Sequence, residues 1–147
     1  MENLTILKSK EKKEIQKLLD MQFDPDFKLD YEVFINNKNR IFILNRELSR
    51  IDIDELRVNS LGLYFGELNN NALRLSIDAS QMVGKTAKKN ILILNDEDIL
   101  KWMNGEDLEL ETELDGFVLV KHKDDFLGCG KIVNKKLYNY VPKERRL

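Results

Sequence analysis

The chain has 147 residues, of which 42% are hydrophobic and 34% are charged. This length suits one compact domain or two very small ones, and the composition argues against wholesale disorder. Lysine and arginine number 24 and aspartate and glutamate 26, for a net charge of −2. The balance excludes a globally basic nucleic-acid binder but leaves room for a local basic face.

The sequence holds one cysteine, Cys129, and one histidine, His122. A single cysteine forms neither an internal disulfide nor a cysteine-rich zinc site, and it suits a reducing compartment. A single histidine argues against a histidine-based metal site or catalytic triad. We therefore expect no metal and no cofactor. The chain also has no apolar run of about 18 residues and no signal-peptide core, so we expect a cytoplasmic protein without membrane contact.

The first part of the chain reads as a small α/β segment. A short strand at 4–7 precedes a helix with Ser9 as its N-cap and an apolar stripe that includes Ile15. Two β-rich runs, 31–35 and 40–44, flank an Asn-rich turn and predict a hairpin. A short helix at 52–56 is expected to follow, and the sequence changes character near Arg57.

The second part is denser in strand and turn signals. Apolar runs at 61–68 and 73–77 flank an Asn-rich turn, and a short helix is expected to end near Gly84. The four apolar residues 91–94 predict a buried strand. Asn95 caps a helix over Asp96–Met103.

Runs 117–120 and 126–133 are expected to pair near the C-terminus. The pattern predicts an α+β fold, with a small, partly open, mixed β-barrel (residues 58–147) preceded by an α/β subdomain (residues 1–57).

Charge is unevenly distributed along the second part. Residues 95–115 hold nine acids against Lys101, whereas residues 121–147 hold eight Lys/Arg and three acids. Such a division can orient a polyanion. It is also what two ordinary solvated faces would look like.

Residues 79–86 fit a loose form of the phosphate-binding P-loop that ends in Gly84-Lys85-Thr86. A P-loop wraps phosphate in backbone N–H groups at the start of a full helix. Only four residues separate Thr86 from the strand expected at 91–94, and Ala79 replaces the first glycine. A short helix followed by a basic loop is the better interpretation, with a nucleotide-binding enzyme as a lesser alternative.

Tyrosines alternate with basic residues near the C-terminus. Tyr138 and Tyr140 lie among lysines and arginines, a pattern that suits RNA because bases stack on rings while cations meet phosphates. The same residues could instead complete a sheet beside a frayed basic tail. The residue chemistry leaves both interpretations open.

Several motifs in order resemble a PUA-like RNA-binding domain. They are the run 61–68, the segment Trp102-Met103-Asn104-Gly105-Glu106-Asp107-Leu108, the pair 115–120 and 126–131, and an L-x-N-x-x-P-K-x-x-R ending over Leu137–Arg146. That ending is similar to the C-terminal PUA-like domain of RsmF-type (Sun-family) RNA cytosine-5 methyltransferases. Residues 1–57 resemble the pre-PUA segment that precedes PUA domains in some proteins.

The resemblance implies a non-catalytic module that binds structured tRNA or rRNA, as an accessory to RNA modification or ribosome biogenesis. The chain has no room for the methyltransferase domain, so a separate RNA-modifying enzyme or ribosome-assembly factor is an expected partner. A protein–protein adaptor that uses the acidic 95–115 side is the alternative. The candidate RNA-binding residues are Gly84, Lys85, Lys88, Lys89, Lys131, Lys135, Lys136, Tyr138, Tyr140, Lys143 and Arg145.

Overall fold

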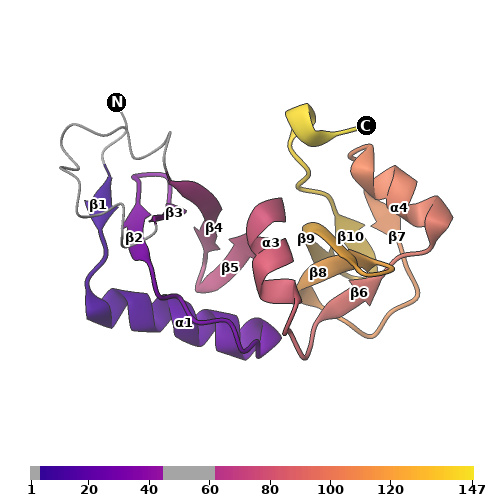
Figure 1. Cartoon of the computed structure of the whole chain (residues 1–147). Coiled ribbons are helices and arrows are strands. Elements are labelled where there is room, and N and C mark those ends of the chain that lie inside the picture. Colours follow the sequence, from indigo (N-terminus) through magenta and orange to yellow (C-terminus); the bar gives the residue numbers. More distant parts are fainter. Residues whose placement is uncertain (1–3, 45–61) are drawn as a thin grey trace.

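The computed structural model describes residues 4–44 and 62–147 and shows two five-stranded sheets side by side (Figure 1). Helix α1 runs beneath the first sheet, α3 lies between the sheets, and α4 lies at the outer side of the second. The helix expected at 52–56 and the boundary at residues 57/58 lie outside the described residues. The division into two domains therefore stays a prediction.

The first sheet is antiparallel throughout, in the order β1-β2-β3-β4-β5. The predicted hairpin is confirmed, with Asn39 at φ 62° in its turn. Asn70 and Asn71 also have positive φ, which asparagine tolerates better than most residues. The strands β4 and β5 continue this sheet beyond β3. The bounds are β1 Thr5–Ile6, β2 Glu32–Ile35, β3 Arg40–Leu44, β4 Leu63–Asn69 and β5 Ala72–Leu75.

Helix α1 spans Ser9–Phe23. Its N-cap is Lys8 rather than the predicted Ser9, and the Lys8 amide donates to the Glu11 carboxylate at 3.2 Å. Ser9 is thus the first helical residue. At the other end Asp24 has left-handed φ and ends the helix. The buried stripe of α1, which includes Ile15, packs into the first core.

The second sheet has the order β6-β8-β9-β10-β7 and curls into a half-barrel. Strands β6 and β8 are parallel, and the other pairs are antiparallel. The predicted pairing of the last two long strands is confirmed, as is the α+β fold class, with a curled sheet after a small α/β segment. The bounds are β6 Ile91–Ile93, β7 Leu108–Glu109, β8 Gly116–His122, β9 Asp125–Val133 and β10 Lys136–Tyr138.

The predicted strand at 91–94 is confirmed as β6, but the prediction that it is buried is wrong for most of its length. Strand β6 is an edge strand, so its outer side has no neighbouring strand to cover it. Ile93 is 70% exposed, whereas Leu94 is buried just after the strand ends.

Two short helices have the predicted capping. Ser76 caps α3, Ile77–Gly84, and Asn95 caps α4, Asp96–Met103, each by accepting a backbone hydrogen bond. The α4 residue Trp102 is fully buried, and its indole N–H donates to the Leu127 carbonyl at 2.7 Å. Helix α4 therefore covers one face of the second sheet.

The two cores lie on opposite faces of the second sheet. One contains Trp102 and the inward residues of β8–β10, including Ile132. The other joins α1, the first sheet and α3 to Phe117 and Cys129 of the second sheet. The sheet is thus covered on both sides near β8. Among the described residues, no helix is both long and apolar enough to cross a bilayer.

Candidate nucleic-acid interface

Strands β9 and β10 of the second sheet carry a surface that is both basic and aromatic. Lys131 on β9 lies opposite Phe117 of β8 and Tyr138 of β10, and Lys136 lies opposite Val133. Since side chains alternate along a strand, these residues share one face while Leu137 and its neighbours enter the core. We call this set the β9–β10 face; its members are the exposed Val133 and Tyr138 and the half-buried Lys131 and Lys136.

Cations sit against rings on the β9–β10 face. The Lys131 ammonium lies 5.4 Å from the Phe117 ring centroid, and the Lys136 ammonium lies 5.1 Å from that of Tyr138. Tyr138 is 38% exposed. Phe117 is buried, so the ring available for stacking is that of Tyr138, with the Lys136 ammonium beside it to neutralise a phosphate.

Lys135 lies in the turn between β9 and β10, at φ 62°. Its ammonium donates to the Thr112 carbonyl at 3.3 Å and lies 4.0 Å from the Glu111 carboxylate. Part of its charge is therefore directed at Glu111, which lines the same hollow as Val133, Lys136 and Tyr138 of the β9–β10 face.

The segment after β10 is clamped by Asn139. The Asn139 amide donates to the Asp107 carboxylate at 2.8 Å, and its side-chain N–H₂ donates to the carbonyls of Trp102 and Glu106. Its side-chain oxygen accepts from the Val141 amide at 2.7 Å. The Gly-Glu-Asp motif and the C-terminal ending, 32 residues apart, thus meet at one residue.

A C-terminal arginine completes the clamp. Arg146 donates to the Val141 carbonyl at 3.0 Å, and a Cβ at Gly105 would clash with its guanidinium. Gly105 also has φ +90°. The local structure explains these motif positions, and they hold Tyr140 in place.

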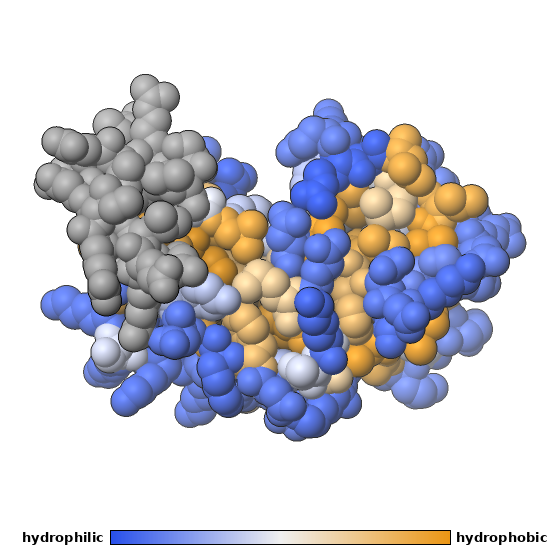
Figure 2. Space-filling view, in the orientation of Figure 1, coloured by the Kyte–Doolittle hydropathy of each residue, from blue (hydrophilic) through white to orange (hydrophobic). Residues whose placement is uncertain are grey.

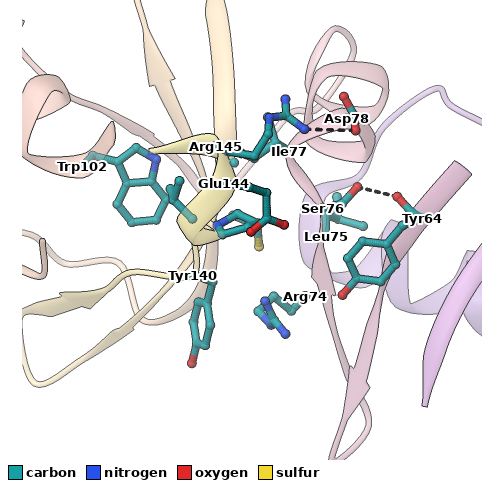
Figure 3. Close-up of a pocket in the computed structure, with 14 residues that line it drawn as sticks. Tyr64, Arg74, Leu75, Ser76, Ile77, Asp78, Trp102, Tyr140, Glu144 and Arg145 are labelled. Atoms are coloured by element: carbon teal, nitrogen blue, oxygen red, sulfur yellow. Dashed lines mark hydrogen bonds and ion pairs between the residues drawn. The ribbon is translucent and has the colours of Figure 1, made fainter. Parts of the chain in front are cut away.

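Tyr140 and Arg145 line a cavity of about 350 Å³ between the first sheet and the C-terminal segment (Figure 3). The Arg74 guanidinium lies 4.4 Å from the Tyr140 ring centroid. Arg145 lies 3.5 Å from the Asp78 carboxylate of α3, and Lys143 is exposed in the short 3₁₀ turn Lys143–Arg145. The cavity is thus walled by residues far apart in the sequence.

Arg74 is a residue that the sequence did not single out. It lies on β5, and its guanidinium donates to the Glu67 carboxylate of β4 at 2.6 Å. Its Nε is buried without a hydrogen-bond partner. Burial raises the pKa of the nearby Tyr64 phenol above its ordinary value. The only sequence signal was a lone cation alternating with Leu73 and Leu75.

The candidate residues Lys85, Lys88 and Lys89 do not all lie at the same end of the second sheet. Lys88 and Lys89 directly precede β6, and parallel strands begin at the same end of a sheet, so both lie at the end where β8 and Phe117 begin. Lys131, opposite Phe117, lies at that end too. Lys85 instead lines a hollow with Asp124 and Asp125, near the opposite end of these strands.

Lys88 is engaged by the loop that follows α1. Its ammonium lies 2.8 Å from the Asp26 carboxylate and donates to the Asp24 carbonyl. The hydrogen bond between them raises the pKa of Lys88 and lowers the pKa of Asp26. Both groups are exposed, so the pair is an accessible contact that phosphate can compete for.

Gly84 is buried at the end of α3, where a Cβ would lie 2.5 Å from the Phe126 ring. Packing against that ring is therefore sufficient to explain this glycine. Residues 79–83 lie within α3, so their backbone groups are in a helix and not in a phosphate cradle. The nucleotide-binding alternative is wrong for this reason.

The remaining chemistry-bearing residues have structural partners. The His122 Nε2 lies 2.7 Å from the Asp96 carboxylate, and this hydrogen bond lowers the pKa of Asp96. Burial raises the pKa of Cys129 to about 12, as expected of a thiol in the core. Across residues 4–44 and 62–147, no group of three His, Cys, Asp or Glu residues is placed to hold a metal ion.

Comparison with known proteins finds a likeness to a PUA domain in the C-terminal part of the chain. Residues 89–147 match the family model described as the methyltransferase RsmF PUA domain. The chain as a whole is similar to ribosomal RNA small subunit methyltransferase F, with 26% identity to the protein of Vibrio parahaemolyticus over 141 residues and 24% to that of Vibrio vulnificus over 135.

These alignments cover 92% of this chain but only 29% and 28% of the relatives. The protein of Vibrio campbellii, at 27% identity over 143 residues, is covered to the same extent, 92% and 29%. The resemblance to the PUA-like domain of RsmF-type methyltransferases is thus confirmed, and a domain of this class indicates RNA binding.

Proposed function

We propose that the chain binds structured ribosomal RNA through the β9–β10 face and does not itself catalyse a reaction. The observation that carries the proposal is the register of β8, β9 and β10, which sets Lys131, Lys136 and Tyr138 on one face of the sheet. Lysine ammonium groups attract the phosphates of RNA, and unpaired bases stack on an exposed aromatic ring.

Lys89 extends this surface along the same end of the sheet, next to the start of β8. Lys143 adds charge beyond β10. The acids of α4 would repel RNA from that side and so restrict the orientation in which it docks, whereas Glu109, opposite Lys136, and Glu111 lie beside the β9–β10 face.

Ribosomal RNA is favoured over tRNA because the relatives are named for methylation of small-subunit ribosomal RNA. The part of those relatives that this chain spans is under one third of their length. We further propose an accessory role, in which the chain holds the RNA for a separate modifying enzyme or an assembly factor in the cytoplasm.

The test is a charge-reversal comparison. Lys131→Glu/Lys136→Glu alters the β9–β10 face, and Lys13→Glu/Lys17→Glu makes the same change at exposed positions of α1. Affinity for a labelled helical fragment of small-subunit ribosomal RNA is measured by fluorescence anisotropy, with duplex DNA as a control. Each variant's melting temperature is recorded.

The proposal predicts that the β9–β10 variant loses about tenfold or more in RNA affinity and has a salt slope reduced by about 2, since each phosphate contact contributes about 1. The α1 variant should stay within about twofold of wild type, since exposed charges far from the RNA are screened. Equal losses in both variants would contradict the site. No RNA binding at low salt would favour the adaptor alternative.

A further inference from the structure

The cavity beside Tyr140 combines features that suit a single nucleotide. Its volume of about 350 Å³ is at the lower end of the range for small-ligand sites, about 300–1,000 Å³. It is therefore too small for a helix but large enough for one base with its sugar. Figure 3 shows Tyr140, Arg74 and Tyr64 across the same opening, from the C-terminal segment to the first sheet.

Arg74 and Tyr140 form a cationic and aromatic wall. The guanidinium lies 4.4 Å from the ring centroid, and its bond to Glu67 at 2.6 Å fixes its orientation. A planar guanidinium stacked on a ring is a surface on which nucleobases stack, and its remaining N–H groups match phosphate or base oxygens.

Acceptors lie on the other sides of the cavity. The carboxylates of Asp78 and Glu144 and the hydroxyl of Ser76 are part of its lining. Ser76 is occupied, because it donates to the Tyr64 carbonyl and caps α3. Asp78 faces Arg145 at 3.5 Å, but carboxylate oxygens have further lone pairs that can accept from base amino or imino groups. The mixture of a flat cationic wall with carboxylates fits a base better than it fits a bare phosphate.

The cavity lies close to the β9–β10 face along the chain. Only Asn139 separates Tyr138 from Tyr140, so the two rings belong to positions at most about 7 Å apart along the backbone. Asn139 is itself held by Asp107, Trp102 and Glu106, so the spacing of the two rings is fixed by the fold.

We infer that this cavity receives one unpaired nucleotide of the RNA bound on the β9–β10 face, with its base against the Arg74–Tyr140 wall. The inference rests on the proposed function and adds a preference to it: a helix with a bulged nucleotide binds more tightly than the same helix fully paired. Extrusion of a base is easiest where the base is already unpaired.

Two RNA hairpins test the inference, identical except for one bulged nucleotide. Wild-type protein should prefer the bulged hairpin by about tenfold, within the range of a single base–aromatic stack. Tyr140→Leu and Arg74→Gln should remove the preference while changing affinity for the paired hairpin by less than about twofold. Tyr138→Leu, a change of the same kind on the β9–β10 face, should weaken binding of both hairpins.

A spectroscopic readout covers the case in which a variant does not fold. With 2-aminopurine at the bulge, wild-type protein should quench its fluorescence by stacking, and a paired 2-aminopurine in the same hairpin should change little. Binding of both hairpins without preference or quenching would overturn the inference and leave the proposed function intact. Equal losses on both hairpins from Tyr140→Leu would also overturn it, whereas binding of neither hairpin by wild-type protein would overturn both.

Discussion

The backbone amide of Asn139 donates a hydrogen bond to the Asp107 carboxylate at 2.8 Å. This bond joins the loop after α4 to the segment after β10, and the side chain of Asn139 makes three further bonds around it. The position of Tyr140, and with it one wall of the cavity, depends on this clamp.

Replacing Asn139 with alanine should destabilise the fold by about 2–3 kcal/mol. The side chain would no longer meet the carbonyls of Trp102 and Glu106 or the Val141 amide, and each lost bond contributes about 1 kcal/mol. Urea unfolding of both proteins measures the difference. Asn37→Ala, at an exposed turn position, is the control and should stay within about 0.5 kcal/mol of wild type. A similarly small effect at Asn139 would contradict the clamp.

Replacing Gly84 with alanine should destabilise the protein by about 1–2 kcal/mol, although alanine is the better helix former. The new methyl group would meet the Phe126 ring, and overpacking of this kind outweighs about 1 kcal/mol of helix propensity. Gly84→Ala/Phe126→Leu should recover part of the loss by making room. RNA affinity of the folded variant should remain near that of wild type. A tenfold loss of affinity in a stable Gly84→Ala protein would show instead that RNA approaches this glycine.

Cys129 should resist alkylation in the folded state. Burial holds its pKa at about 12, so the thiol remains protonated and covered where an ordinary thiol, with a pKa of about 8.5, ionises. Iodoacetamide labelling at pH 9, followed by mass spectrometry, should be slow in buffer and rapid in urea. Labelling at the same rate in both conditions would refute the burial of Cys129.

The same thiol makes stability depend on pH. Between about pH 8.5 and 12 the unfolded chain releases the Cys129 proton and the folded chain keeps it, so this residue lowers the free energy of unfolding as pH rises. A Cys129→Ala variant lacks the effect. The stability difference between wild type and this variant should therefore shift against wild type by up to about 1.4 kcal/mol per pH unit in that window. A constant difference from pH 8 to 10 would contradict the raised pKa.

Charge reversal at Lys89 should weaken RNA binding by about three- to tenfold, and reversal at Lys85 by less than about twofold. Lys89 precedes β6 at the end of the sheet that also holds Lys131, whereas Lys85 lies beside Asp124 and Asp125, which already disfavour RNA there. Anisotropy titrations of Lys89→Glu and Lys85→Glu against one RNA measure both effects. The reverse order would place the RNA at the α3 end.

Much of the local structure could be predicted because local signals decide it. Asn95 and Ser76 cap their helices, and alternating apolar residues with an Asn-rich turn specify the hairpin of β2 and β3. Ser9 failed as a cap because the Lys8 amide already pairs with Glu11, which moves the start of α1. Ile93 failed as a buried residue because an apolar run does not tell whether a strand lies at the edge of its sheet.

Only part of the candidate site could be predicted from the sequence. The alternation of Lys131, Lys136 and Tyr138 around a tight turn predicts one shared face once the register is known. Arg74 could not be found in this way, because its relation to Tyr140 depends on how the first sheet meets a segment 66 residues later. The division of Lys85 from Lys89 likewise required the parallel pairing of β6 with β8.

The most direct test of RNA binding on the β9–β10 face is a nuclear magnetic resonance titration of ¹⁵N-labelled protein with a helical fragment of small-subunit ribosomal RNA. The account predicts that the largest amide shifts gather at Lys131, Lys136 and Tyr138 and extend to Lys89, with little change along α1 or the acidic start of α4. Shifts concentrated on α1 or on α4, with the β9–β10 face unchanged, would contradict it.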